Sequence, residues 1–341
     1  MTPLGFETRV VVDDGQHNAF TDLIAWRGSV WLAYTASPTH FGSPQSRVVV
    51  LRSSDGRAWT EAARLDGAGE DLRDPKLAVI RDQLVVLALL NRSANPRPYA
   101  TVRAESPDGQ RWSAISRVGP DGWLLGKPKT LDNESWYAPA HNLEIPASAL
   151  LRSTDGRSWE TVSLIHDRDG ADETAIEFLP DGRLQAAIRI ESGGGYFGSA
   201  RAGTLLARAR PPFVEWQRSL CQVTRLDGPA LFSVGATIYA AGRFQPILRW
   251  PFQGHGSMIS RKRCSLFRLD GETLTRLLDL PSAGDTAYPG VARWGTQILV
   301  SYYTNDPGRD RAWILGMRAP TSVRVAAFDI STFPPTPGGR R

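Results

Sequence analysis

The strongest constraint on the fold is a short motif that recurs three times at nearly constant spacing. The copies read "RSSDGRAW", "ESPDGQRW" and "RSTDGRSW", and their aspartates are Asp55, Asp108 and Asp155. These aspartates are 53 and 47 residues apart (108 − 55 and 155 − 108). Asp-Gly favours a tight hairpin turn, because glycine accepts a positive φ and the aspartate bonds to nearby amides. The spacing therefore predicts a repeated unit of about fifty residues that contains a hairpin.

A second pattern gives the number of units. Six times, a short polar start leads into an apolar stretch, a turn and a second apolar stretch, at intervals of roughly 45 to 60 residues. The starts are "FTDLIAW", "LRDPKLAVI", "GKPKTL", "ADETAIEFL", "DGPALFSV" and "AYPGVARW". This interval is typical of propeller blades, each a four-stranded sheet. We therefore predict an all-β fold, a six-bladed β-propeller, with a pair of β-sandwiches as the alternative.

The same patterns predict how the chain is organised. We expect one domain over residues 1–341, with a disordered tail from about residue 333, where "PPTPGGRR" ends the chain. The Asp-Gly turns are expected to join strands three and four of the first three blades. The terminal strands "TRVVVDD" and "SVRVAAFDI" are expected to share one blade, which closes the ring and removes free sheet edges.

Composition and charge narrow the class of partner. The net charge is +5, but the basic residues are scattered apart from "SRKRCS", so we expect no nucleic-acid partner and favour a glycan or small anionic sugar. No stretch approaches the ~20 apolar residues of a membrane span, so no membrane is expected. The two cysteines lack zinc-ligand spacing, and we expect neither a metal nor a cofactor. The first residues lack a signal-peptide pattern, so the expected compartment is the cytoplasm, or outside the cell if a leader was removed. The oligomeric state is not predicted.

Propeller geometry predicts where a site would form. The starts of the first strands and the ends of the second strands converge at one mouth of the ring. The starts offer Asp22, Arg73, Asp74, Lys76, Lys127, Lys129, Asp172, Glu173, Asp227 and Tyr288. The ends offer Tyr34, Asn91, His141, Arg189, Arg243 and Tyr303. This mouth is dense in charge, whereas the mouth with the Asp-Gly turns is expected to be structural.

With Asp-Gly-x-x-Trp turns in a six-bladed layout, nearly the whole chain resembles the sialidase (neuraminidase) superfamily. The resemblance implies a Tyr/Glu nucleophile pair, three arginines that grip a substrate carboxylate, and an aspartic acid/base in the first blade. "ADETAIEFLPDGRLQAAIRIES" looks like the segment with the glutamate and one arginine, which implies Glu173 and Arg189. "IYAAGRF" places Arg243 as another carboxylate arginine, and "DTAYPGVA" implies Tyr288 as the nucleophile.

Two positions depart from the superfamily pattern. "AFTDLI" has Thr21 and Asp22 where the first arginine is expected. The loop "TASPTHFGSPQS", where the aspartic acid/base is expected, contains no carboxylate, and His40 is its only group that titrates near neutrality. The proton donor is therefore predicted to be His40, or Asp22 or Asp74. Both departures weaken the case for sialic acid itself as the substrate.

The residue chemistry supports this assignment and leaves alternatives. A free tyrosine has a pKa of about 10, so it needs a base such as Glu173 and nearby guanidinium groups to act as a nucleophile. Otherwise Tyr288 is a packing aromatic, and Arg189 and Arg243 form salt bridges to Asp172 or Asp227. The remaining predicted substrate-binding residues are Arg73, Asp74, Lys76, His141 and Asp227.

The function predicted from sequence is an exo-glycoside hydrolase that cleaves a terminal anionic sugar with retention of configuration. One alternative is a propeller hydrolase or lyase on uronate glycans, in which His40 and Tyr288 exchange protons. The other alternative is a non-catalytic propeller that binds a glycan.

Overall fold

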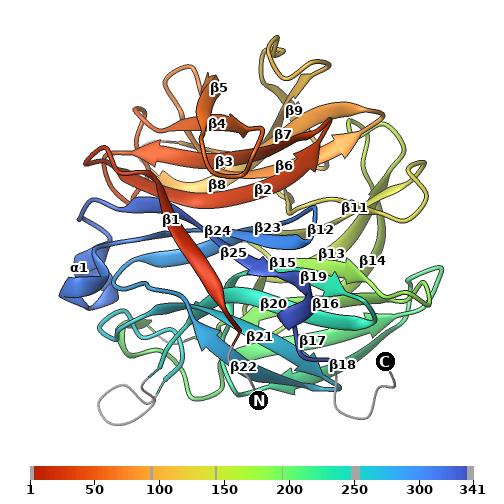
Figure 1. The fold of residues 1–341 in the computed structure, drawn as a ribbon. Coiled ribbons are helices and arrows are strands. Elements are labelled where there is room, and N and C mark those ends of the chain that lie inside the picture. Colours follow the sequence, from red (N-terminus) through yellow and green to blue (C-terminus); the bar gives the residue numbers. More distant parts are fainter. Residues whose placement is uncertain (1–3, 93–94, 143, 194, 247–253, 336–341) are drawn as a thin grey trace.

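The computed structural model describes residues 4–92, 95–142, 144–193, 195–246 and 254–335. Within these residues the chain forms six antiparallel sheets arranged as a ring, and one end strand of each sheet lies toward the centre of the ring (Figure 1). The predicted all-β, six-bladed β-propeller is confirmed. No helix among the described residues has the length and apolar character needed to cross a membrane.

The first three blades follow one another along the chain, and each runs from the axis outward. Blade 1 contains β2 (His17–Trp26), β3 (Ser29–Ser37), β4 (Arg47–Ser53) and β5 (Thr60–Asp66). Blade 2 contains β6 (Asp71–Ile80), β7 (Gln83–Arg92), β8 (Asn95–Ser106) and β9 (Ser116–Val118). Blade 3 has a divided inner strand, and contains β10 (Leu124–Leu125), β11 (Lys129–Thr130), β12 (Trp136–Asn142), β13 (Ala147–Ser153) and β14 (Glu160–His166).

The last three blades include the closure of the ring. Blade 4 contains β15 (Ala171–Phe178), β16 (Leu184–Ile190), β17 (Gly203–Ala209) and β18 (Trp216–Cys221). Blade 5 contains β19 (Asp227–Val234), β20 (Thr237–Phe244), β21 (Arg263–Asp270) and β22 (Thr273–Asp279). Blade 6 contains β23 (Thr286–Trp294), β24 (Gln297–Thr304), β25 (Ser322–Asp329) and β1 (Phe6–Val12). A short helix, α1 (Trp313–Gly316), lies in the connection from β24 to β25.

The N-terminal strand completes the last blade, as predicted. β1 pairs antiparallel with β25, with Phe6 opposite Phe328 (Figure 1). The end of the chain differs from expectation. Phe333 is buried, and the carbonyls of Pro334 and Pro335 accept hydrogen bonds from Tyr239 and Arg268. The expected disordered tail is therefore wrong for residues 333–335, and residues 336–341 lie outside the described part of the chain.

The hydrophobic core is divided among the interfaces between neighbouring blades. In one such layer, Trp31 of blade 1 packs with Leu77 and Val86 of blade 2. Five further clusters fill the other five interfaces. Packing between adjacent sheets buries apolar side chains around the whole ring, so the axis itself is free to hold polar groups.

The Asp-Gly motifs form the predicted turns between strands three and four of blades 1 to 3. In the first, the Asp55 carboxylate accepts the amides of Arg57 and Ala58 at 2.8 and 2.9 Å, and Gly56 has φ +72°. Each turn packs on the preceding blade. A Cβ on Gly109 would lie 2.1 Å from the Trp31 ring, so only glycine fits there. Asp132 makes the same local bonds at a turn that the repeat did not predict, because Asn133 replaces the glycine.

Bulges in the inner strands direct side chains toward one mouth. The register of five inner strands shifts between Ala19/Asp22, Arg73/Lys76, Ala171/Thr174, Asp227/Ala230 and Ala287/Gly290. Four bulges hold a residue of positive φ, namely Phe20, Asp74, Gly228 and Tyr288. A bulge bends the strand and changes the direction of its side chains. The charged residues at these points therefore do not follow the regular alternation of side chains between the two faces of the sheet.

Candidate active site

Tyr288 lies at the bulge of β23, in a conformation that its surroundings enforce. Its φ is +44°, a region that costs a non-glycine residue of order 1–3 kcal/mol. The ring packs edge-on against Phe20 with centroids 4.9 Å apart, and the Arg243 guanidinium lies 5.0 Å from its centroid. A Cβ on Gly228 would lie 2.6 Å from the Tyr288 ring, so the glycine permits this approach. These contacts fix the direction of the hydroxyl.

The Tyr288 hydroxyl donates a hydrogen bond of 2.5 Å to one oxygen of the Glu173 carboxylate. The other oxygen accepts the amide of Gly228 at 2.7 Å and pairs with Arg189 at 2.8 Å. Arg189 also lies 3.4 Å from the Tyr288 hydroxyl. The structure therefore brings together three residues that come from blades 4 and 6.

Burial and neighbouring charges set the protonation states of Tyr288 and Glu173. Burial and the adjacent Glu173 carboxylate raise the pKa of Tyr288 well above its ordinary value. Burial alone would raise the pKa of Glu173, but Arg189 and the hydrogen bonds from Tyr288 and Gly228 lower it below the ordinary value. At neutral pH the pair is therefore a phenol beside a carboxylate, an arrangement in which the acid oxygen can accept the phenol proton.

A small pocket opens in front of Tyr288. It brings together several residues that the sequence predicted, namely Asp74, Lys76, His141, Glu173 and Tyr288. The Lys76 ammonium donates to Asp74 at 2.6 Å. Burial nevertheless raises the pKa of Asp74, and burial lowers the pKa of His141 to about 4. The pocket thus offers a carboxyl group whose pKa is raised and an imidazole that is neutral near neutral pH.

Arg189 is held by a carboxylate on its own blade. Its Nε and Nη2 bond the two oxygens of Asp172 at 2.8 and 2.5 Å. Burial and the nearby Glu173 raise the pKa of Asp172 against the opposing effect of Arg189. The salt bridge to Asp172 that the sequence left open is therefore present in the structure.

Arg243 lies behind Tyr288 and is almost fully buried, at 1% exposure. Its guanidinium donates to the Thr286 carbonyl at 2.9 Å, to Asp285 at 3.1 Å and to the Tyr303 hydroxyl at 3.0 Å. The Trp313 ring covers its other face, 4.5 Å from the guanidinium carbon. Arg243 therefore supports the Tyr288 ring from below and does not face the pocket.

Two further ion pairs each join residues two apart in the sequence, one within β6 and one at the start of β19. Arg73 bonds both oxygens of Asp71 at 2.5 and 3.0 Å, and Arg225 bonds both oxygens of Asp227 at 2.6 and 3.0 Å. Sequence analysis missed Asp71 and Arg225. The signal that could have found them is the i, i+2 spacing in "DLR" and "RLD", because such residues point the same way along a strand.

His40 lies behind Phe20 and outside the pocket lining. Its Nδ1 is 2.7 Å from Asp285, and its ring centroid is 5.4 Å from that of Phe20. Burial lowers the pKa of His40 despite Asp285. His17, also missed in the sequence, bonds the Ala319 carbonyl through Nδ1 and places Nε2 3.1 Å from Asp285. Among the described residues His17, His40 and Asp285 form the one group whose ligand atoms are close enough for a metal ion, but the 2.7 Å contact is a hydrogen-bond length.

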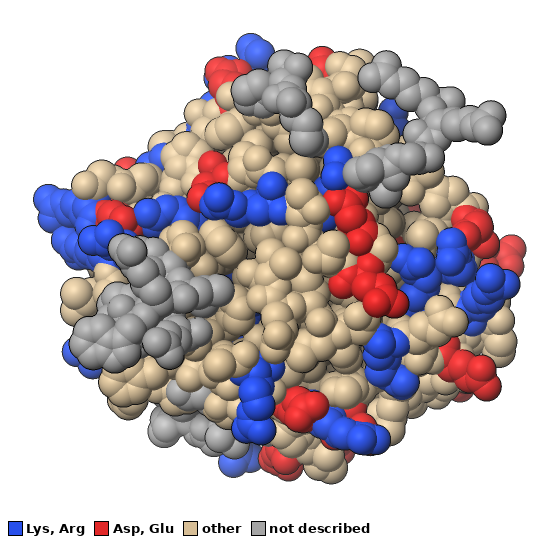
Figure 2. Space-filling model, turned by 90° about the horizontal axis from the view of Figure 1, so that it is seen from below, with Lys and Arg blue, Asp and Glu red and all other residues tan. Residues whose placement is uncertain are grey.

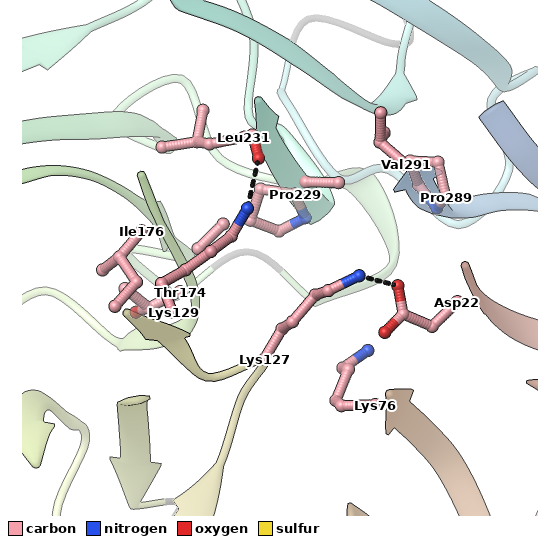
Figure 3. Close-up of a pocket in the computed structure, with 12 residues that line it drawn as sticks. Asp22, Lys76, Lys127, Lys129, Thr174, Ile176, Pro229, Leu231, Pro289 and Val291 are labelled. Carbon is pink, nitrogen blue, oxygen red and sulfur yellow. Dashed lines mark hydrogen bonds and ion pairs between the residues drawn. The ribbon is translucent and has the colours of Figure 1, made fainter. Parts of the chain in front are cut away.

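Asp22 lies deeper, in a cavity on the propeller axis. Its carboxylate accepts Lys127 at 2.8 Å and the amide of Leu77 at 2.7 Å, and Lys129 reaches toward the Leu231 carbonyl (Figure 3). Asp22 does not line the pocket in front of Tyr288. The predicted site residues therefore lie in different places. Some line the pocket in front of Tyr288, whereas Arg243 and His40 lie outside that lining and Asp22 lies in this axial cavity.

Comparison with known proteins shows similarity in structure where sequence comparison shows none. No protein-family model matches the chain, and no curated protein sequence matches it. Among solved structures, phage phi92 endosialidase superposes with a TM-score of 0.74 at 10% identity, covering 99% of this chain and 71% of the phage chain. Trypanosoma rangeli sialidase gives 0.67 at 14% identity, covering 92% of this chain and 55% of the other. An α-L-arabinanase of Penicillium chrysogenum gives 0.61 at 15% identity, covering 96% and 98%.

The fold is the sialidase-type six-bladed β-propeller. At these identities the similarity extends to the fold alone, and the activity must be argued from the residues. In the face shown in Figure 2, Lys and Arg are interspersed with Asp and Glu around a broad uncharged area.

Proposed function

We propose that this chain is a retaining glycoside hydrolase in which Tyr288 is the nucleophile and Glu173 its base. The observation that carries the proposal is the 2.5 Å hydrogen bond from the Tyr288 hydroxyl to Glu173, at the wall of an open pocket. A purely packing tyrosine does not require a backbone of positive φ or a buried carboxylate partner. The names of the structural neighbours, which include two sialidases and an arabinanase, support a carbohydrate substrate.

In the proposed first step, the Tyr288 oxygen attacks the anomeric carbon and its proton passes to Glu173. The bond to the leaving oxygen breaks, and Asp74 supplies the proton that this oxygen needs. Arg189 stabilises the negative charge that develops on the phenol oxygen. In the second step, a water oxygen attacks the anomeric carbon and the bond from that carbon to the Tyr288 oxygen breaks. Asp74 takes one proton of the water, and Glu173 returns its proton to the Tyr288 oxygen. Two displacements on the same carbon retain its configuration.

Asp74 is the best supported of the three predicted proton donors. It lines the same pocket as Tyr288, and burial biases its carboxyl toward the protonated form that a donor requires. Asp22 is bonded in the axial cavity, and His40 does not line the pocket; its ring contacts Phe20, which in turn contacts Tyr288. We propose that His40 instead positions Asp285, and through it Arg243 and the Tyr288 ring.

The test is hydrolysis of a broad panel of aryl glycosides by the wild type and by Tyr288→Phe and Glu173→Gln. We expect each substitution to lower kcat by at least about 100-fold, the usual contribution of a nucleophile or its base, while the fold stays intact. Tyr302→Phe is the matched control, since this buried tyrosine on β24 bonds the Pro281 carbonyl away from the pocket.

The outcomes separate the alternatives. Full activity in Tyr288→Phe would contradict the nucleophile assignment. Products with a new C=C absorbance would favour the lyase, and binding of a sugar without turnover across the panel would favour a non-catalytic propeller.

A further inference from the structure

We infer that the sugar held against Tyr288 is uncharged, an inference that rests on the proposed glycosidase function. It departs from the anionic sugar expected from the sequence. That expectation required arginines at the mouth with free guanidinium edges, because a bidentate grip on a substrate carboxylate uses two parallel N–H groups. In the structure, carboxylates of the protein itself bind these guanidinium N–H groups.

Three arginines at the mouth are each bidentate to an aspartate. Arg189 is held by Asp172, Arg225 by Asp227 and Arg73 by Asp71, with every N–O contact between 2.5 and 3.0 Å. The remaining nitrogen of each guanidinium, Nη1, also faces an oxygen atom of the protein. The Nη1 of Arg189 pairs with Glu173 at 2.8 Å, that of Arg73 donates to the His40 carbonyl at 2.7 Å, and that of Arg225 lies 3.6 Å from Glu191.

The fourth arginine cannot reach a substrate. Arg243 is 1% exposed and lies between the rings of Tyr288 and Trp313. Its N–H groups bond Thr286, Asp285 and Tyr303. A substrate carboxylate would have to displace both an aromatic ring and an aspartate to contact this guanidinium.

The lysines are paired or covered as well. Lys76, the one lysine among the described residues that lines the pocket in front of Tyr288, is bonded to Asp74. Lys127 and Lys129 pair with Asp22 and Glu177 around the axial cavity. Lys262 is 1% exposed and donates to Gln245 at 2.7 Å under the Trp313 ring.

The pocket itself is lined by groups that suit hydroxyls and not carboxylates. Asp74 and Glu173 face it, and His141 is held neutral because burial lowers its pKa. Leu89, Leu125, Pro229 and Pro289 provide apolar surface for the C–H face of a sugar ring. A substrate carboxylate would leave water for a pocket whose one described lysine, Lys76, already bonds Asp74 and whose Glu173 is ionised, and such desolvation is costly.

A phenol nucleophile suits a mouth in which the positive and negative charges are already paired. When the Tyr288 proton moves to Glu173, the total charge of the pair is unchanged, and the ion pairs around it need not rearrange. The carboxylates that the arginines engage hold the guanidinium groups rigid, which positions Arg189 beside the phenol oxygen.

The first test compares kcat/KM across aryl pentosides, aryl hexosides, the uronide matched to each hexoside, and an aryl sialoside. A uronide differs from its hexoside only by a carboxylate in place of CH₂OH. We expect an uncharged member to be cleaved with kcat/KM at least about 100-fold above every charged member, the ratio that an unpaired buried carboxylate implies. Faster cleavage of a charged member, lost in Tyr288→Phe, would overturn this inference while the glycosidase proposal stands. No cleavage of any member would remove the glycosidase proposal and this inference with it.

The second test frees an arginine by Asp227→Asn, which leaves Arg225 without its carboxylate partner. We expect kcat/KM for the uronide to rise at least about tenfold relative to its hexoside, since a guanidinium edge becomes available. Asp270→Asn is the matched control, because Arg268 bonds both oxygens of Asp270 in the same i, i+2 manner on the far part of blade 5. Asp71→Asn, which frees Arg73, repeats the test if Asp227→Asn does not fold. An equal change in the control, or no change in either freed variant, would contradict the inference.

Discussion

Aspartates occupy both ends of the propeller, but their partners differ. At one end Asp55, Asp108 and Asp155 bond amides within their own turns, and they lie at the surface. At the mouth, the aspartates are buried and bond guanidinium groups, in two cases from other strands: Asp71, Asp172, Asp227 and Asp285. The first arrangement needs only local sequence and serves folding. The second arrangement costs free energy because charged groups lose their water, and it is typical of functional sites that use fixed charges.

The largest expected effect is a loss of activity when Asp74, a carboxyl group at the mouth, is substituted. A proton donor must be protonated, and burial raises the pKa of Asp74, so activity should persist at low pH and fall as pH rises through that raised pKa. Asp74→Asn should remove this alkaline limb and lower kcat by roughly 10²–10⁴-fold on a glycoside with a poor leaving group. A pH profile of kcat measures both. An unchanged alkaline limb in the variant would assign the proton to another group.

The next effect compares one aspartate from each end. Asp172→Ala leaves Arg189 buried without its bidentate partner, so the free energy of unfolding should fall by about 3–5 kcal/mol. Asp108→Ala removes solvated turn bonds and should cost clearly less, with no loss of activity. Urea denaturation of the two variants gives the comparison. Equal losses would mean that the two ends do not differ as described.

Gly228→Ala probes the close approach at the mouth. The added Cβ would lie 2.6 Å from the Tyr288 ring, and the glycine has φ +56°, so the ring must move. We expect a loss of about 1–3 kcal/mol in stability and a fall in kcat, because the hydroxyl leaves Glu173. Gly235→Ala is a matched control at φ +58° with open space around its Cβ position. Thermal unfolding and kcat are measured together, and a normal kcat in Gly228→Ala would contradict the need for this contact.

The smallest effect concerns acid stability at the turn end. Backbone amides hold the pKa of Asp55 and Asp108 below their usual value of 3.8. These carboxylates therefore stabilise the fold above that value, and the contribution is lost as pH falls through their lower folded pKa. Asp55→Asn with Asp108→Asn should flatten the decline of Tm below pH 4. An unchanged slope would show that these turns do not contribute to acid sensitivity.

The fold was predictable because its signals are local. Asp-Gly turns and alternating apolar stretches act over a few residues, and their spacing alone gave six blades and the closing pair β1 and β25. The start of the tail was less predictable, since Phe333 is buried by Tyr239, a residue of another blade that the local sequence does not reveal.

The site was predictable only in part. Tyr288, Glu173, Asp74 and His141 were expected at the mouth, and they line one pocket. The direction of Asp22 was not predictable, because a bulge at Ala19/Asp22 changes which way the strand residues point. Asp227, the partner offered for Arg243, lies 3.6 Å from its guanidinium. The closer partners were missed because Asp285 precedes β23 and Trp313 comes from α1, far away in the chain.

The most direct measurement is mass spectrometry of the protein after reaction with a slowly released fluoro-glycoside of the best panel sugar. A retaining mechanism with a tyrosine nucleophile leaves a glycosyl group on the phenol oxygen. The account predicts one added sugar on the peptide that contains Tyr288 in the wild type, and none in Tyr288→Phe. A label on any other residue, or turnover with none on that tyrosine, would contradict it.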